Sequence, residues 1–298
     1  MSSFSRRDFL KSTAGLGAAV AMGAAAVPAA AATKRAATDW VTLGNSGVKV
    51  TRLAFGTGTF GGRVQRELGQ AEFTKLVRHA YDRGIRFFES ADAYGEMHEM
   101  LAEALKGIPR DSYRLMTKMR LGEKDPVPQT LDRFRKELNT EYFDITLLHC
   151  VRTPDWATTY ERFRDEFSEA KQKKVLLAHG ASCHGLMPIR QFPGNKWLDV
   201  SLNRINHNGT RMDTIPSEGN TPGDVNEVTA HLAKIHAQGT GTLGMKLCGE
   251  GKFTTPEDRQ KALNYVFGLG TVDAVTMGYK STAEIDEAIE RVNTALNS

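Results

Sequence analysis

Residues 85–106 read IRFFESADAYGEMHEMLAEALK, an apolar run that passes through a polar, small-residue stretch into a segment with helical periodicity. A short apolar run favours a buried strand, and apolar residues at intervals of three and four favour a helix. The stretch therefore predicts one β-strand followed by one α-helix. Glu89, Asp92 and Tyr94 lie where that strand ends.

The same order of strand and helix recurs along the chain. Strand-like runs occupy residues 51–57, 85–90, 113–118, 143–149, 174–182, 198–206, 241–247 and 272–278. Helix-like segments follow them at residues 69–83, 96–106, 126–138, 155–170, 185–191, 223–237, 256–267 and 282–294. This repetition, in a chain of about 250 residues after the N-terminal segment, predicts a (β/α)8 TIM barrel.

Two absences in the sequence support one barrel domain over residues 40–298. No G-x-G-x-x-G follows a strand, which argues against a doubly wound dinucleotide-binding sheet. No Pro-rich or low-complexity boundary interrupts these residues either.

The N-terminus has the features of a cleavable export signal. Residues 1–32 begin with basic residues, continue with an alanine-rich apolar stretch and end in small residues near Ala30–Ala32. The run from Ser5 to Lys11, with its Arg6-Arg7 pair, resembles the bacterial twin-arginine signal. We expect recognition by the twin-arginine export machinery, a short linker at residues 33–39 and a periplasmic location. An uncleaved membrane anchor is the weaker alternative because the run is marginal for a spanning helix.

Charge and cysteine content exclude several classes of protein. The formal net charge is +4, and removal of residues 1–32 lowers it to +2, so we expect no nucleic-acid partner. No second apolar stretch is long enough to span a membrane, so we expect no stable insertion after signal cleavage. The three cysteines, Cys150, Cys183 and Cys248, do not suggest a disulfide framework.

Titratable residues gather at consecutive strand ends. Glu89 ends the second strand and leads to Tyr94, Lys118 ends the third and His149 ends the fourth. In a (β/α)8 barrel these ends form the active-site face. A neighbouring ammonium would lower the pKa of a tyrosine, a carboxylate would hold that ammonium in place, and an imidazole could orient a carbonyl.

These motifs resemble those of the aldo/keto reductases, over essentially all of residues 40–298. FFESADAYGE (87–96) resembles the Asp-Thr-Ala-x-x-Tyr-Gly motif of that family, and LDRFRKELNTEYFDITLLH (131–149) resembles its segment ending at a catalytic histidine. LGNSGVKVTRLAFGTGTFGG (43–62) resembles its entry hairpin and first strand.

The resemblance implies nicotinamide-dependent reduction of a small aldehyde, ketone or sugar carbonyl, or the reverse oxidation of an alcohol. It implies Tyr94 as the general acid, Lys118 as the modulator of its pKa and His149 as the donor that orients the substrate. Glu89 stands where the family normally has aspartate, and we expect it to face Lys118.

The resemblance also implies a cofactor site, in which several residues depart from the family. Cys183 replaces an asparagine, Arg204 a glutamine and His207 a stacking tyrosine. The implied cofactor-binding residues are Thr57, Ser182, Cys183, Arg204, His207, Lys246, Leu247, Gly249, Lys280 and Ser281. The choice between NADP(H) and NAD(H) stays open, because Lys280 and Ser281 fit a phosphate whereas Glu284 lies where many members carry a cation.

Two alternatives remain at this point. Cysteines and histidines at the strand ends could form a metal or reactive-thiol site, although no C-x-x-C or H-x-x-x-H spacing supports it. The barrel could also bind a nucleotide without turnover, as a redox sensor or partner subunit.

Overall fold

Eight parallel strands close into a barrel in the computed structural model, which describes residues 34–122, 124–215 and 222–298. The hydrogen-bonded order is β10-β3-β4-β5-β6-β7-β8-β9. These strands are β3 (Leu53–Gly56), β4 (Phe87–Glu89), β5 (Arg114–Arg120), β6 (Phe143–Val151), β7 (Leu176–Cys183), β8 (Val200–Arg204), β9 (Gly241–Met245) and β10 (Ala274–Met277). The predicted (β/α)8 barrel is confirmed.

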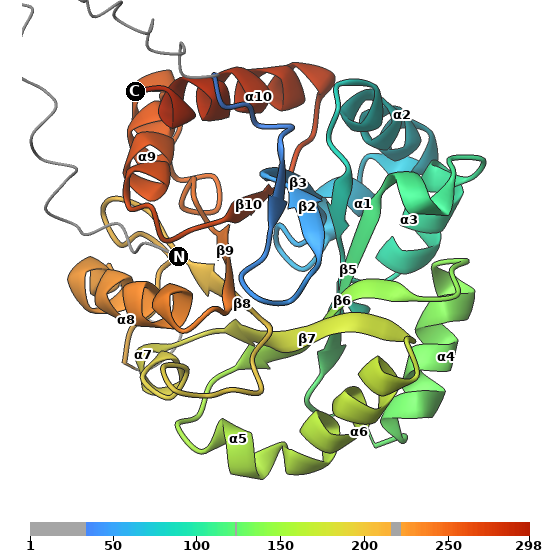
Figure 1. Cartoon of the computed structure of the whole chain (residues 1–298). Coiled ribbons are helices and arrows are strands. Elements are labelled where there is room, and N and C mark those ends of the chain that lie inside the picture. The colour runs from blue at the N-terminus through green and yellow to red at the C-terminus, as the bar shows by residue number, and fades with distance from the viewer. Residues whose placement is uncertain (1–33, 123, 216–221) are drawn as a thin grey trace, which may run out of the picture. The chain divides into compact units, whose positions relative to one another are not determined.

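Helices surround the strands (Figure 1). They are α1 (Arg63–Arg66), α2 (Gly69–Asp82), α3 (Met97–Leu105), α4 (Val127–Glu137), α5 (Trp156–Thr159), α6 (Glu161–Gln172), α7 (Leu186–Ile189), α8 (Val225–Ala237), α9 (Pro256–Gly268) and α10 (Thr282–Leu296), with 3-10 turns η1 (Asp92–Tyr94) and η2 (Arg110–Ser112). The single helix expected at residues 155–170 was wrong. Tyr160 leaves the helical region with φ −109° and ψ 29°, so α5 and α6 are separate.

Polar side chains fix where the last three long helices begin. Asp224 accepts a hydrogen bond from the Glu227 N–H at 2.8 Å and caps α8, and Ser281 accepts one from the Glu284 N–H at 3.2 Å and caps α10. Thr255 caps α9, which then begins with proline at its first position. Such caps satisfy backbone donors that have no partner within the helix.

An antiparallel hairpin belongs to the inner core of the barrel. It consists of β1 (Trp40–Thr42) and β2 (Lys49–Thr51). Leu43, Val48 and Val50 pack in one buried cluster with inward-facing residues such as Phe87 and Ile145. The interior is thus filled with side chains, and a site has to lie where the strands end.

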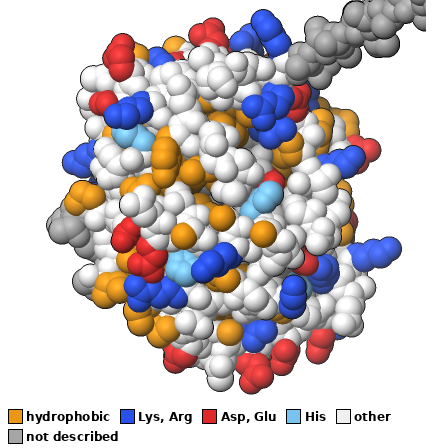
Figure 2. All heavy atoms as spheres, turned by 60° about the vertical axis from the view of Figure 1, so that its left-hand side comes forward, with side chains coloured by type: hydrophobic (Ala, Val, Ile, Leu, Met, Phe, Trp, Pro, Cys, Tyr) orange, Lys and Arg blue, Asp and Glu red, His pale blue; other side chains and the backbone are white. Residues whose placement is uncertain are grey.

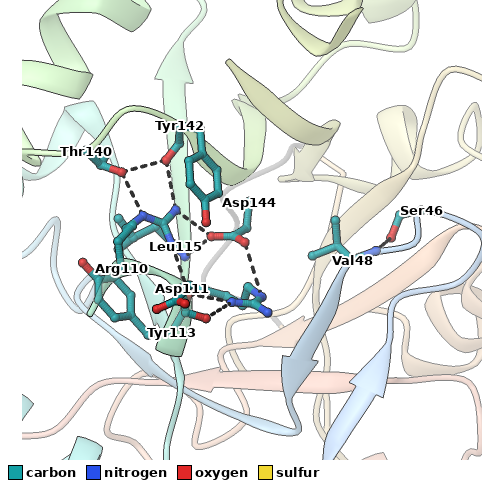
Figure 3. Close-up of polar contacts among 10 residues, drawn as sticks. Ser46, Val48, Arg110, Asp111, Tyr113, Leu115, Thr140, Tyr142 and Asp144 are labelled. Carbon is teal, nitrogen blue, oxygen red and sulfur yellow. Dashed lines mark hydrogen bonds and ion pairs between the residues drawn. The ribbon is translucent and has the colours of Figure 1, made fainter. Parts of the chain in front are cut away.

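A buried carboxylate ties β5 to β6 where both strands begin (Figure 3). Asp144 accepts hydrogen bonds from Arg110 Nη2 at 2.7 Å and from the Leu115 N–H at 2.9 Å. Arg110 also donates to the Thr140 hydroxyl at 2.8 Å and to the Tyr142 carbonyl at 2.9 Å. With these donors and acceptors satisfied, the cluster stabilises the end of the barrel opposite the predicted active-site face.

Residues 34–39 contact the last helix. The Ala37 N–H donates to Asn293 Oδ1 at 2.7 Å, and the Arg35 N–H donates to Asn297 Oδ1 at 3.0 Å. The Ala37 side chain is fully buried. The segment expected as a linker therefore packs on α10 from Arg35 onward, and residues 1–32 lie outside the described residues.

The surface of the described residues carries charges of both signs. Basic and acidic side chains are interspersed on the face that Figure 2 shows. Within the described ranges, no helix combines the length and the apolar character needed to cross a membrane.

Candidate active site

A cavity of about 720 Å³ opens among the segments that follow the strands. Tyr94, His149 and His184 form one group of polar side chains in its wall. A second group is charged and comes from the loops after β9 and β10 and from α9 and α10: Lys246, Glu250, Arg259, Lys280, Glu284, Glu287 and Arg291. This volume lies within the range of about 300 to 1,000 Å³ found for ligand pockets.

Glu89, which lines the cavity, forms a buried ion pair with Lys118. The ammonium of Lys118 donates to Glu89 Oε1 and, at 2.8 Å, to the Ser90 carbonyl. Thr276 donates to the other carboxylate oxygen at 3.2 Å. Burial lowers the pKa of Lys118, and the Glu89 carboxylate acts against that shift. The contact that the sequence predicted between the two side chains is present.

Glycine at position 56 makes room for the longer side chain of Glu89. A Cβ atom placed there would lie 2.4 Å from Thr276 Oγ1 and 3.0 Å from Glu89 Oε2. The first distance is too short for a side chain and the second is tight, so the carboxylate and its hydroxyl partner depend on Gly56. Glutamate therefore fits where a shorter aspartate was expected.

Tyr94 lies between the ion pair and His149. The Lys118 ammonium is 4.8 Å from the centre of the tyrosine ring. The Tyr94 and His149 rings meet edge to face at 5.5 Å and 85°. A Cβ at Gly58 would lie 2.6 Å from the Tyr94 hydroxyl oxygen, so this glycine gives the hydroxyl its space.

The pKa of Tyr94 shifts opposite to the sequence expectation. Burial raises it well above its ordinary value, and the Glu89 carboxylate raises it further. The expectation counted the effect of the Lys118 charge on the tyrosine and gave Glu89 only the task of holding the ammonium, whereas burial is the largest cause of the shift and the Glu89 charge adds to it. Tyr94 is thus a protonated hydroxyl at neutral pH, able to donate a hydrogen bond.

His149 lies within an irregularity in β6. The pairing of β6 with β7 shifts register between Leu148 and Val151, and Cys150 adopts a left-handed φ of +65°. The Cys150 N–H donates to the Ser182 hydroxyl at 2.8 Å. Bulges of this kind redirect side chains near sites. Burial, and then the charge of Lys118, lowers the pKa of His149 well below its usual range, so its ring is neutral.

A second histidine stands beside the first. The His149 and His184 rings are 6.5 Å apart at 86°. Arg204 Nη2 bonds to His184 Nδ1, and Arg204 Nη1 lies 3.8 Å from Asp213 Oδ1. Arg204, expected at the cofactor, is thus directed at His184 and Asp213. The Asp213 side chain is fully buried, and burial raises its pKa to about 7.

Two of the three cysteines, Cys183 and Cys248, lack the features of a reactive thiol, whereas the half-buried Cys150 accepts a hydrogen bond from Arg152 Nε at 3.2 Å. Cys183 is fully buried, its thiol donates to the Gly185 carbonyl at 3.4 Å, and burial raises its pKa well above the usual value. Burial also raises the pKa of Cys248, to about 11. Among the described residues, no group of three or more His, Cys, Asp or Glu side chains could hold a metal ion.

The residues expected at the cofactor divide into two sets. Those that line the cavity are Lys246, Leu247 and Lys280. Those outside its wall are Thr57, Ser182, Cys183, Arg204, His207, Gly249 and Ser281. Thr57 donates to the Glu89 carbonyl at 3.0 Å, and His207 packs at 5.0 Å against Phe253, which itself lines the cavity.

Sequence reasoning missed several contacts in the cavity wall, although it named Glu284. Glu287 Oε1 accepts from Arg259 Nε at 2.8 Å and from Arg291 Nε at 2.6 Å. Glu284 Oε2 accepts the Lys280 N–H at 2.8 Å. The spacing of Glu284, Glu287 and Arg291 on a predicted helix was a usable signal, since such positions share one face. No local sequence pattern indicated that Thr276 and Phe253 would line the cavity.

Most of the chain matches the model of one protein family, and parts of it are similar to known proteins. Residues 52–291 match the model of the Aldo/keto reductase family, and residues 3–23 match that of the twin-arginine translocation signal. "Probable aldo-keto reductase 1" of Glycine max is 30% identical over 168 residues, which are 50% of this chain and 49% of that protein. "Methylglyoxal reductase" of Salmonella typhi is 32% identical over 136 residues, 45% of this chain and 48% of that one. The chain thus matches these relatives over about half of their length.

A solved structure supports the fold alone. The holo form of an aldo-keto reductase from Bacillus halodurans has a TM-score of 0.67 and 17% sequence identity. The match covers 87% of this chain and 95% of that one.

Proposed function

Because the chain belongs to the aldo/keto reductase family, we propose that it catalyses NAD(P)(H)-dependent reduction of a small carbonyl compound to an alcohol, or the reverse oxidation. The observation that carries this proposal is the convergence of Tyr94, the Lys118–Glu89 pair and His149 beside one cavity. Each group then has one task in the reaction.

Tyr94 is the general acid. Its protonated hydroxyl donates a hydrogen bond to the carbonyl oxygen and then transfers the proton as negative charge develops there. Lys118 supplies a fixed positive charge next to the ring, and Glu89 holds that ammonium in position. His149, with a neutral ring, donates to the same carbonyl oxygen and orients it.

The cavity fits a nicotinamide dinucleotide. Lys246, Lys280 and Arg259 bring positive charge to a wall where the pyrophosphate would lie, and Lys246 and Arg259 are held there by ion pairs with Glu250 and Glu287. Position 278, which lines the cavity, has room for glycine alone, because a Cβ atom there would lie 2.4 Å from Thr59 Oγ1. When bound in its reduced form, the cofactor supplies a hydride to the carbonyl carbon. The contact implied for Leu247 remains part of the proposal, whereas Thr57, Ser182, Cys183, Gly249 and His207 lie outside the cavity wall and receive no contact in it.

We infer that NAD(H) binds more tightly than NADP(H). Glu284 already places a carboxylate on the Lys280 N–H at the start of α10, where a helix N-terminus would otherwise receive a phosphate. Glu287 likewise compensates Arg259 and Arg291. A 2′-phosphate would meet these carboxylates, whereas a ribose hydroxyl can donate to them.

The export signal extends the proposal to location. The chain carries a twin-arginine signal sequence at residues 3–23, which indicates export across a membrane. We propose that residues 1–32 are removed, that residues 33–39 join the signal to the barrel of residues 40–298, and that the mature protein resides in the periplasm. Cell fractionation tests the location, and a mainly cytoplasmic protein would contradict it.

Cofactor binding and turnover test the function together. Fluorescence titration of the mature protein with NADH and NADPH, followed by assays with simple aldehydes, should give micromolar or tighter binding and steady turnover. Binding without turnover of any aldehyde would favour the non-catalytic nucleotide-binding alternative. Absence of binding to both dinucleotides would reject the reductase proposal.

A further inference from the structure

His184 lies in the cavity wall beside the proposed catalytic groups and has no role in the proposed reduction of the carbonyl. The Tyr94, His149 and His184 rings form a row, with 5.5 Å between the first two and 6.5 Å between the last two. Neighbouring rings in the row meet edge to face, with interplanar angles of 85° and 86°. The cavity wall beside Tyr94 and His149 therefore contains a second imidazole.

Arg204 fixes the tautomer of that imidazole. A guanidinium carries only donors, so the nitrogen of His184 that it contacts, Nδ1, must be the acceptor. In a neutral imidazole the proton then resides on Nε2. Burial, together with the neighbouring Arg204 charge, lowers the pKa of His184 well below its usual range and keeps the ring neutral. His184 thus presents one N–H donor.

A buried carboxylate keeps this arrangement in place. Arg204 is 8% exposed and Asp213 is fully buried, and the two lie within ion-pair distance at 3.8 Å. Within the described part of the chain, Arg204 is the one group that hydrogen-bonds to the His184 ring. The Nε2 proton is therefore available to a ligand.

We propose that His184 is a specificity-determining residue that donates a hydrogen bond to a second substrate oxygen, on the carbon next to the reacting carbonyl. The preferred substrates are then α-hydroxy aldehydes and ketones or 1,2-dicarbonyl compounds. Leu202 and Met245, which also line the cavity, are apolar and cannot replace this donor, and the ammonium of Lys246 in the same wall donates to Glu250. A substrate without the second oxygen leaves the buried N–H unpaired, which lowers its rate constant. The inference rests on the proposed reductase function.

A matched pair of aldehydes tests the assignment. The mature protein would be assayed with 2-hydroxypropanal and with propanal, at saturating NADH. The unmodified protein should prefer 2-hydroxypropanal in kcat/KM by about tenfold or more. In His184→Phe, which keeps a flat ring but has no donor, this preference should fall to within about twofold, chiefly because the hydroxylated aldehyde binds more weakly and its KM rises. NADH affinity should stay within about twofold. His236→Gln, on a histidine outside the cavity that pairs with Asp273, is the control and should retain the preference.

The outcomes separate the two proposals. Turnover of neither aldehyde would reject the reductase function and this inference with it. Equal turnover of both aldehydes by the unmodified protein would overturn the role of His184 while leaving the reductase function standing. A preference that persists in His184→Phe would also overturn it, as would weaker NADH binding with an unchanged preference, which would assign His184 to the cofactor. If His184→Phe fails to fold, His184→Leu takes its place under the same criteria.

Discussion

The Lys118 ammonium pairs with the Glu89 carboxylate inside the barrel, where the two residues are only 1% and 3% exposed. A buried pair of this kind keeps its geometry because either charge alone would be poorly solvated. Thr276 and the Ser90 carbonyl provide further hydrogen bonds to the pair. The pair therefore joins β4, β5 and β10 and at the same time places a positive charge beside Tyr94.

Removing one partner of this pair should destabilise the fold strongly. Glu89→Gln and Lys118→Met should each lower the free energy of unfolding by about 3 kcal/mol, because each leaves a buried group without its charged partner. The double variant should lose less than the two single losses combined. Urea denaturation measures all three. Glu72→Gln, in an exposed pair with Lys75, is the control and should cost at most about 0.5 kcal/mol. Additive losses in the double variant would contradict energetic coupling of Glu89 and Lys118.

Tyr94→Phe should remove turnover and leave cofactor binding intact. The substitution deletes the hydroxyl beside Gly58 and retains the ring that packs against His149, so kcat should fall by at least about 100-fold. The Kd for NADH, from fluorescence titration, should change by less than about twofold, since the hydroxyl is assigned to the substrate. Tyr81→Phe, whose hydroxyl donates to Ser112, is the matched control. Loss of turnover and binding together would mean that Tyr94 is structural.

Acid should destabilise the protein partly through His179. This histidine stacks on Trp197 at 4.4 Å and 7°, and burial lowers its pKa from 6.5 to about 4. Between pH 6.5 and pH 4 the unfolded chain binds a proton that the folded chain does not, so stability falls with pH across that window. The loss at pH 4 should be on the order of 3 kcal/mol.

The variant His179→Phe tests this origin, because phenylalanine keeps a ring against Trp197 and cannot titrate. Urea denaturation at pH 7 and pH 4.5 should give a smaller loss of stability for the variant than for the unmodified protein. Equal losses would assign the acid sensitivity to other groups.

The sequence was sufficient to predict the barrel and the main members of the site. Apolar periodicity switches between strand and helix eight times, and in a barrel the strand ends must meet, so Tyr94, Lys118 and His149 could be brought together. Side-chain direction could not be predicted, because it depends on contacts between distant segments. Thr276 bonds to Glu89 across 187 positions, and Arg204 turns to His184 instead of the cavity. The direction of the Tyr94 pKa shift was missed for the same reason, since burial and the position of the Glu89 charge are tertiary effects.

Glu284→Gln should shift the cofactor preference toward NADPH. Glu284 accepts the Lys280 N–H while its own N–H donates to Ser281, which is a capping arrangement that glutamine can also form. The variant therefore keeps the start of α10 and removes one negative charge from the cavity wall. A 2′-phosphate carries negative charge, whereas the ribose hydroxyl of NADH does not, so the Kd ratio of NADPH to NADH should fall by about three- to tenfold. Parallel fluorescence titrations measure the ratio, and Glu257→Gln, in the first turn of α9 and outside the cavity lining, is the control. An unchanged ratio in Glu284→Gln would mean that the adenine end of the cofactor lies elsewhere.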